Sequence, residues 1–317
     1  MMGFHHLAWL NTLLDNLSRF LLPLIQPLQG KTSSFVKNSR HFVELLGSIE
    51  VTQENKLISF DVESLYTNVP VEEVLQIIQR KLSEDGNLKE RTNLPIEVIM
   101  ELLGCCVRNC YFQLKDEFFT QDEGLPMGSP LSPVIANIYM EWFETLAIQE
   151  AHKKPRVWLR YVDVTFIIWN HGNTELDAFL KHINSVRPSI TFTMEKEIHN
   201  ELPFLDVLVK RTDTKWETSV YRKPTHTGQY LNHESNHHQS TKRGIIKTLL
   251  DRAFGLCNTK EGLEKELDII KNDLQRNEYS KAMVEKTLAK RQQEPHKEKN
   301  RHNQCLHFPT SEDYRRG

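Results

Sequence analysis

The stretch Trp-Leu-Arg-Tyr-Val-Asp-Val-Thr-Phe-Ile-Ile-Trp, residues 158–169, decides the fold of this chain. Two short runs of aromatic and β-branched residues flank Asp163 and Val164, which predicts a β-hairpin with an acid at its tip. Aspartate is a common turn residue, so a buried hairpin with a purely structural turn is the alternative. Two stretches that precede it in the chain favour a functional role.

The first of these is Ser-Phe-Asp-Val-Glu-Ser-Leu-Tyr at residues 59–66, where Asp61 ends a buried apolar strand. The second is Gly-Leu-Pro-Met-Gly-Ser-Pro-Leu-Ser-Pro at residues 124–133, a loop that opens a helix in which Pro133 suits the first turn. Alone, Asp61 is equally explained as an aspartate that approaches a helix, and such a loop is a weak signal. Together the three stretches predict one site.

In this order the three stretches resemble the A, B and C motifs of the reverse transcriptase palm. The residues of these motifs are most similar to those of the reverse transcriptases of Penelope-like retroelements. Those proteins carry a run nearly identical to residues 60–70 and an Arg-Tyr-Val-Asp-Asp hairpin. Here Val164 replaces the second hairpin aspartate. The resemblance covers roughly residues 7–288. It lacks the family's basic finger segment with its Arg-Pro-Ile run and a downstream nuclease domain, which implies partial fingers.

Composition is that of an ordinary soluble protein, with 39% hydrophobic residues, 26% charged residues and a formal net charge of -2 over 317 residues. Residues 4–28 are rich in leucine but lack a basic leader and are interrupted by polar residues, which favours an amphipathic helix over a signal peptide or membrane span. Five cysteines without a CxxC pair indicate reduced thiols and disfavour zinc. We expect an intracellular, nuclear protein without a membrane partner. The cysteines are Cys105, Cys106, Cys110, Cys257 and Cys305.

Hydrophobic periodicity predicts an α+β fold with an antiparallel sheet backed by helices. The resemblance implies that this sheet is a right-hand polymerase palm with partial fingers and a helical thumb. We expect four segments: residues 1–50 as N-terminal helices and partial fingers, 51–223 as the palm, 224–290 as a thumb-like or helix-turn-helix-like module, and 291–317 as a disordered tail. The expected elements are a helix within residues 4–28, a helix around Phe42, a strand at 56–60, a helix from Pro70, a polar loop at 83–93, a helix over 99–107, a hairpin at 111–121, a helix after Pro133, the central hairpin, a helix opened by a capping box at 174–177, a strand at 190–194, a hairpin of 204–209 with 216–221, and helices over 246–253 and 263–274.

Nucleotide addition is a phosphoryl transfer that two divalent cations stabilise, and magnesium prefers carboxylate oxygens from a few acids. Asp61 and Asp163 lie 102 positions apart, so only the fold can bring them together. The resemblance assigns them as catalytic and metal-binding residues for Mg²⁺ or Mn²⁺. It also assigns Tyr66 to exclusion of a 2′-hydroxyl, with a core tyrosine as the alternative. The residues that it places around the nucleotide are Tyr66, Gly124, Pro126, Gly128, Ser129 and Tyr161.

A basic segment follows the palm, because residues 210–255 hold nine Lys or Arg against four Asp or Glu, a surplus of +5. Such a surplus favours contact with a phosphate backbone. His233, His237 and His238 in this segment are solvated loop histidines or, alternatively, metal ligands. The residues predicted to bind nucleic acid are Arg222, Lys223, Lys242 and Arg243.

The resemblance therefore implies RNA-directed DNA polymerisation on an RNA template and a DNA primer with deoxynucleoside triphosphates. Val164 offers no oxygen, so the activity is expected to be impaired. The rival hypothesis is an inactive nucleic-acid-binding remnant of a retroelement.

Overall fold

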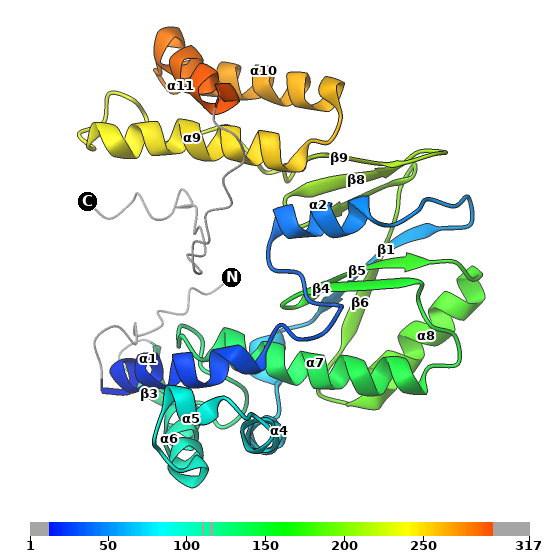
Figure 1. Ribbon diagram of the computed structural model, residues 1–317, viewed down its shortest axis with the longest axis vertical. Helices are drawn as coiled ribbons and strands as arrows, with labels where there is room; N and C mark the ends of the chain where they lie inside the picture. The colour runs from blue at the N-terminus through cyan, green and yellow to red at the C-terminus, as the bar shows by residue number, and fades with distance from the viewer. Residues whose placement is uncertain (1–12, 110, 115–116, 294–317) are drawn as a thin grey trace. The chain divides into compact units, whose positions relative to one another are not determined.

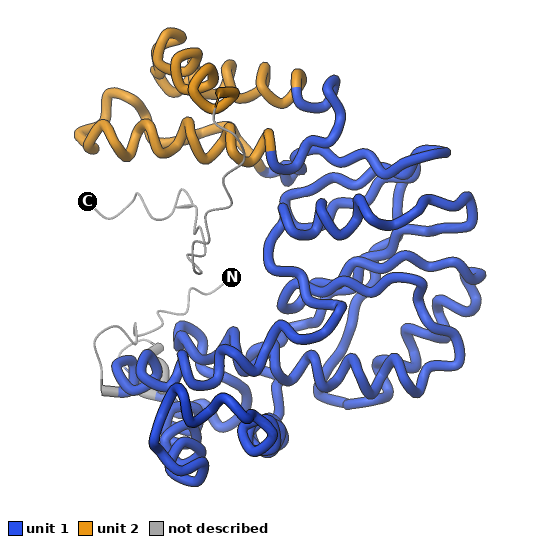
Figure 2. The backbone as a smooth tube through the Cα atoms, in the orientation of Figure 1, with its two compact units in different colours: residues 1–225, 255–263 blue, residues 226–254, 264–317 orange. Residues whose placement is uncertain are grey.

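The structure is a computed structural model that describes residues 13–109, 111–114 and 117–293 (Figure 1). The chain divides into two compact units (Figure 2). Unit 1 comprises Met1–Thr225 and Gly255–Leu263, and unit 2 comprises His226–Phe254 and Glu264–Gly317.

Unit 1 is built around a four-stranded sheet in the order β4-β5-β1-β6, with every neighbouring pair antiparallel. The predicted hairpin forms β4 and β5, and the predicted strand that leads to Asp61 forms β1 in the centre of the sheet. An antiparallel sheet with helices packed against it is the α+β plan, so this prediction is confirmed. The strands are β1 (Lys56–Val62), β4 (Val157–Tyr161), β5 (Val164–Trp169) and β6 (Phe192–Lys196).

The strands separate two hydrophobic cores because successive side chains point to opposite faces of a sheet. Ile58, Phe60 and Val62 belong to the first core, whereas Leu57 belongs to the second. Figure 1 shows α7 and α8 on one side of the sheet and α2 with a second, three-stranded sheet on the other.

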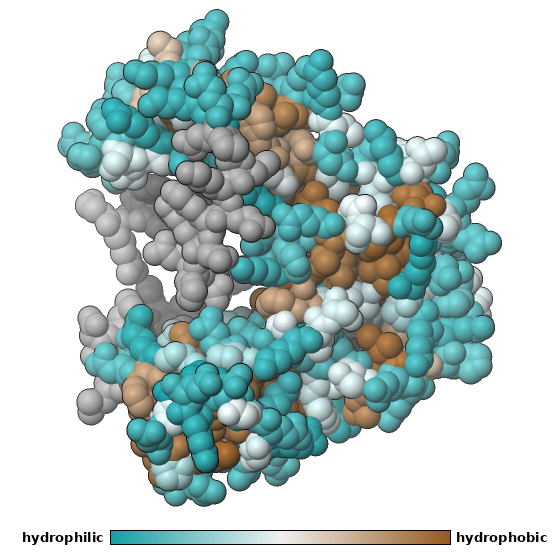
Figure 3. Space-filling view, viewed as in Figure 1, coloured by the Kyte–Doolittle hydropathy of each residue, from teal (hydrophilic) through white to brown (hydrophobic). Residues whose placement is uncertain are grey.

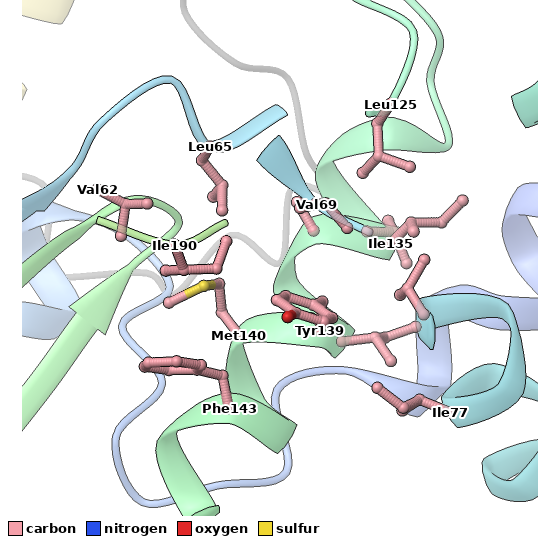
Figure 4. Close-up of a cluster of buried hydrophobic side chains, with 14 of the residues drawn as sticks. Val62, Leu65, Val69, Ile77, Leu125, Ile135, Tyr139, Met140, Phe143 and Ile190 are labelled. Carbon is pink, nitrogen blue, oxygen red and sulfur yellow. The ribbon is translucent and has the colours of Figure 1, made fainter. Parts of the chain in front are cut away.

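The first core joins the central sheet to most of the helices of unit 1, and part of it is drawn in Figure 4. The Phe60 ring lies 6.1–6.2 Å from the rings of Trp158, Phe179 and Phe192. Helix α7 is apolar on nearly all sides, which explains why most of it is buried. The helices are α1 (Leu13–Ile25), α3 (Leu65–Asn68), α4 (Val71–Ser83), α5 (Leu88–Arg91), α6 (Ile96–Arg108), α7 (Ser132–Glu150) and α8 (Asn173–Val186), with a 3₁₀ turn at Gln26–Leu28.

The second core lies between the central sheet, helix α2 and the three-stranded sheet β7-β8-β9. The Phe42 ring lies 4.9 Å from that of Phe166 and 4.6 Å from that of Phe204, so three elements meet at one aromatic contact. The elements are α2 (Ser39–Gly47), β7 (Glu201–Phe204), β8 (Val207–Arg211) and β9 (Trp216–Val220). A separate hairpin pairs β2 (Tyr111–Leu114) with β3 (Glu117–Thr120).

Three local predictions were wrong. Residues 204–209 do not form one strand, because Leu205 adopts a φ of +54° and begins a two-residue turn between β7 and β8. The loop at 83–93 contains the short helix α5. Thr174 lies inside α8 and Gly172 occupies the N-cap, so the expected capping box does not form. The first part of the helix expected within residues 4–28 lies outside the described residues.

Unit 2 contains one whole helix, α11 (Lys281–Gln293), and most of two others, α9 (Gln239–Leu256) and α10 (Lys260–Arg276). Buried apolar residues include Ile246, Leu249, Ile270 and Leu274, which confirms the two predicted helical stripes. Helix α11 runs past Arg291, where the tail was expected to begin, and residues 294–317 lie outside the described residues. Along the described part of the chain, every helix is too short or too polar to cross a membrane.

Candidate active site

Asp61 is exposed near the end of β1, on the sheet face that carries Leu57. Its Cα partner on β5 is Val164, and its partner on β6 is Thr193. Cross-strand partners project to the same face of a sheet. Val164 therefore lies beside Asp61, and the acid that precedes Val164 lies at the adjoining turn.

Asp163 is the second residue of the two-residue turn between β4 and β5. Its carbonyl accepts a hydrogen bond from the Val62 N–H at 3.0 Å, which ties the turn to the end of β1. Val162, the first turn residue, has a φ of +54°. This left-handed backbone is strained for a β-branched residue, and such strain is concentrated at functional sites.

A buried ion pair between Arg160 and Glu144 supports this turn. The Arg160 side chain is fully buried, and its Nε donates to Glu144 Oε1 at 2.6 Å. Its Nη1 donates to the Val162 carbonyl at 2.9 Å and to Asn137 Oδ1 at 2.8 Å. Glu144 also accepts from Trp158 Nε1 at 2.6 Å. Sequence analysis missed this network, although a charged residue within an apolar strand was a signal for it.

Burial raises the pKa of Asp61, and the negative charge of Asp163 raises it further, with smaller contributions from Glu195 and Glu63. Burial also raises the pKa of Asp163, while hydrogen bonds from the backbone and the charge of Arg160 oppose that shift. The fold thus brings Asp61 and Asp163 into electrostatic contact. Among the described residues, no three His, Cys, Asp or Glu side chains are arranged to hold a metal ion. Glu195 was not singled out from sequence, because only strand register places it near Asp61.

Tyr66 lies on the single-turn helix α3, which the chain enters through Ser64 at a φ of +50°. It is half-buried and packs against the first core. Its carbonyl accepts a hydrogen bond from the Leu125 N–H at 2.6 Å. The backbone that carries Tyr66 is therefore joined directly to the loop at residues 124–133.

That loop contains two glycines with different reasons to be glycine. At Gly124 the φ is +77° and an added Cβ would lie 2.5–2.6 Å from backbone atoms of Thr67. At Gly128 the φ is +93°, but no atom lies within 4 Å of an added Cβ. Within the protein, the close backbone approach therefore occurs at Gly124. At Gly128 the space that a Cβ would occupy is open.

The other predicted nucleotide residues divide between supporting and surface positions. Pro126 and Ser129 are buried, and the Pro126 carbonyl accepts a hydrogen bond from Ser132 Oγ at 2.6 Å. Tyr161 is half-buried and packs against the second core, on the sheet face that carries Asp61. Pro126 and Ser129 therefore shape the loop, and Tyr161 borders the acids.

The four predicted basic residues are not equally accessible. Lys223 and Arg243 are exposed and Arg222 is half-buried, but Lys242 is only 5% exposed. Lys242 faces the interior of unit 2 and cannot meet a phosphate there, so its assignment is corrected. Exposed Lys247 is a better candidate on the same helix. On the face shown in Figure 3, the helices of unit 2 present mainly hydrophilic residues.

The predicted histidine group remains at the surface. His237 and His238 are exposed, and their Nδ1 atoms lie within hydrogen-bond distance of the Ser235 and Ser240 hydroxyls, at 3.2 Å and 2.7 Å. This arrangement favours solvated loop histidines. Of the three cysteines that the structure describes, Cys105 is exposed, Cys257 is half-buried and Cys106 is buried in the first core.

Comparison with known families gives two matches. The model of the reverse transcriptase (RNA-dependent DNA polymerase) family matches residues 5–197, which is more than half of the chain. The animal helix-turn-helix domain matches residues 229–289. In sequence, no curated protein matches the chain.

Three solved structures share the fold. Telomerase from Candida albicans, in complex with a fragment of telomeric RNA, has a TM-score of 0.58 at 15% identity and covers 86% of this chain and 48% of its own. Apo telomerase from Candida tropicalis has a TM-score of 0.52 at 12% identity, with coverages of 87% and 50%. The RNA-dependent RNA polymerase of a human picobirnavirus has a TM-score of 0.51 at 8% identity, with coverages of 86% and 52%. The chain spans about half the length of these polymerases, and the predicted palm fold is confirmed.

Proposed function

Because this chain belongs to the reverse transcriptase (RNA-dependent DNA polymerase) family, we propose that it is an RNA-directed DNA polymerase that works by two-metal nucleotidyl transfer. One observation carries the mechanism. Asp61 lies near the end of β1 and Asp163 in the turn between β4 and β5, which is hydrogen-bonded to the end of β1, so that two negative charges lie at one end of the central sheet. Two such carboxylates are what a magnesium-dependent phosphoryl transfer requires.

The donor set at this edge fits Mg²⁺ or Mn²⁺. Both acids offer oxygen ligands, and their raised pKa values mean that a nearby cation would stabilise the ionised pair. Asp61 and Asp163 would hold the ions, which supply charge stabilisation for the attacking and leaving oxygens. Arg160 keeps the turn that carries Asp163 in place through the Val162 carbonyl.

Val164 is the reason to propose impaired activity. It stands across from Asp61 on β5, where the resembling family has an acid, and valine contributes neither oxygen nor charge. Removal of one electrostatic stabiliser typically costs about 10²–10³ in rate. The site therefore retains two of three acids, and weak turnover follows.

The remaining parts of the site would bind the substrates. Tyr66 would exclude a ribose 2′-hydroxyl, and Gly124, Pro126, Gly128, Ser129 and Tyr161 would surround the incoming deoxynucleoside triphosphate. The template would be RNA and the primer DNA. We further propose that the chain derives from a Penelope-like element and acts in the nucleus, on the strength of the run at residues 60–70 and the Arg-Tyr-Val-Asp hairpin.

A second candidate function is nucleic-acid binding without turnover. It is favoured by the helix-turn-helix match at residues 229–289 together with Val164 in the acid position. In that case the palm is a scaffold, and unit 2 binds the nucleic acid through exposed residues such as Arg243 and Lys247.

Primer extension by the unaltered chain tests the choice. With an RNA template, a DNA primer and Mg²⁺ or Mn²⁺, weak extension is expected, and Asp163→Ala should abolish it. Asp177→Ala, at an exposed position on α8, is the control and should extend like the parent. Extension that survives Asp163→Ala would contradict the assignment of the site. No extension with either metal would favour the binding function.

A further inference from the structure

Gly124 and the backbone at Tyr66 are packed against each other more closely than any side chain would allow. An added Cβ at Gly124 would lie 2.5 Å from Thr67 Cα and 2.5 Å from Thr67 O. The next residue, Leu125, donates its N–H to the Tyr66 carbonyl at 2.6 Å. We propose that Gly124 is a positioning residue that sets the place of Tyr66 and thereby the choice between deoxyribose and ribose. The proposal rests on the proposed polymerase function.

The contact cannot be relieved by rotating a side chain, because the atoms in the way belong to the Thr67 backbone. Any residue other than glycine must therefore displace either the loop or the turn that carries Tyr66. The φ of +77° at Gly124 adds strain to the same substitution.

The loop is anchored in the first core and at the start of helix α7. Leu125 is fully buried, and in Figure 4 it lies near Val69 and Ile135 in the first core. The Pro126 carbonyl is held by Ser132 Oγ at 2.6 Å, at the start of the long helix α7. These contacts oppose a displacement of the loop.

The turn that carries Tyr66 is short and is held largely by hydrogen bonds within its own segment. Helix α3 has four residues, and it is closed by the hydrogen bonds Thr67 N–H to Ser64 O at 3.1 Å and Val69 N–H to Leu65 O at 3.0 Å. Tyr66 and Thr67 are half-buried. A Cβ at Gly124 would therefore push Thr67 and shift the neighbouring ring of Tyr66, and a shift of this kind relaxes steric exclusion at the sugar.

Two other glycines provide matched controls. Gly128 has a comparable φ of +93° but open space around an added Cβ, so its substitution imposes strain without touching Thr67. Gly30 has a nearly identical φ of +75° and a tight contact of 3.2 Å, but the contact is with the ring of Phe35. Gly30→Ala thus matches the backbone strain at another place in unit 1.

The activity arm uses the full chain in a Val164→Asp background and compares kcat/KM for deoxy- and ribonucleotides. Gly124→Ala should lower the deoxy-to-ribo ratio at least about tenfold, within the range by which small pocket changes alter selectivity. Gly30→Ala should leave the ratio unchanged, and Gly128→Ala should change it less than Gly124→Ala, whatever it does to KM. In a Tyr66→Ala background, Gly124→Ala should have no further effect on the ratio, because the coupling runs through Tyr66.

A structural arm works without turnover. Fluorotyrosine-labelled protein gives a ¹⁹F resonance for Tyr66 that Tyr66→Phe identifies. Gly124→Ala should shift that resonance, and Gly30→Ala should not. An unshifted resonance in folded Gly124→Ala protein overturns the proposal, and so does a shifted resonance with an unchanged sugar ratio. If Val164→Asp extends no primer with any nucleotide, the polymerase function fails and the sugar role with it, while the resonance still decides whether Gly124 positions Tyr66.

Discussion

Val164 is the cross-strand partner of Asp61 in the antiparallel pair of β5 and β1. The two side chains therefore share one face of the sheet. On the other side of Val164 in sequence is Asp163, whose charge already acts on Asp61. A residue at position 164 thus shares a sheet face with Asp61 and follows Asp163 in the chain, and valine offers no oxygen there.

Restoring an acid there should restore activity. Val164→Asp places a third carboxylate beside Asp61 and Asp163, where two cations must be held against their mutual repulsion. We expect primer extension to rise at least about a hundredfold, the scale on which single electrostatic stabilisers act. A magnesium series measures the gain, which should be largest at limiting magnesium.

Asp61→Ala provides the blank for that experiment, and Val164→Asn separates shape from charge. Asparagine supplies an oxygen without a negative charge, so its gain should be smaller. If Val164→Asp is as inert as the blank while it still binds primer and template, the binding function becomes the better proposal.

The stability of unit 1 should depend on pH through Asp61. Its pKa in the folded protein lies above the ordinary value of 3.8. The contribution of Asp61 to the free energy of unfolding is therefore fully present below that value and is lost as pH rises through the folded pKa. Asp61→Asn removes this loss. Without divalent cations, the variant should gain stability relative to the parent as pH rises from about 4 to neutrality.

Tryptophan fluorescence during urea unfolding measures this difference, because all five tryptophans belong to unit 1. Magnesium should stabilise the parent and narrow the gap, since a ligand that binds only the folded state adds stability. If the difference in the free energy of unfolding between Asp61→Asn and the parent does not change with pH, the pKa of Asp61 is not raised in the folded protein.

The buried pair of Arg160 and Glu144 should matter far more than an exposed pair. Arg160→Met leaves the Glu144 carboxylate buried without its partner and frees the Val162 carbonyl. The expected loss in the free energy of unfolding is about 3–5 kcal/mol. Lys196→Ala, which breaks the exposed pair with Asp177, should cost about 0–1 kcal/mol. Equal losses in the free energy of unfolding for Arg160→Met and Lys196→Ala, measured by the same urea experiment, would refute the role of Arg160 in supporting the turn.

Unit 2 should bind nucleic acid through exposed cations on α9. Arg243→Ala with Lys247→Ala should weaken binding to duplex DNA. The slope of log affinity against log salt should fall by about 0.9 for each phosphate that the variant no longer neutralises. Anisotropy of a labelled primer–template across a salt series measures both effects. Buried Lys242 should contribute nothing to the slope.

Helix α10 offers the control for that binding experiment. Its acids outnumber its bases, five to four, so Lys265→Ala on its exposed surface should leave the slope unchanged. An affinity that does not vary with salt, or an equal response to Lys265→Ala, would exclude α9 as the binding surface.

Much of unit 1 was predictable from local pattern. The apolar runs on either side of Asp163, the strand before Asp61 and the proline after the loop each carry their own signal within about ten residues. Side-chain alternation and helical spacing are consequences of backbone geometry, and they show in the sequence wherever one face is buried. The strand–loop–hairpin order and the α+β plan followed from these signals.

The tertiary structure alone decided which residues meet. The register of β1 against β5 places Val164 opposite Asp61, and the packing of residues 124–126 on α3 brings Gly124, and not Gly128, against the backbone of Thr67. Glu144 and Arg160 meet because α7 packs against β4, and Lys242 is buried by the fold of unit 2. These facts depend on contacts between segments far apart in the chain. The sequence shows which residues are apolar or charged, but only packing of the core determines which of them come into contact.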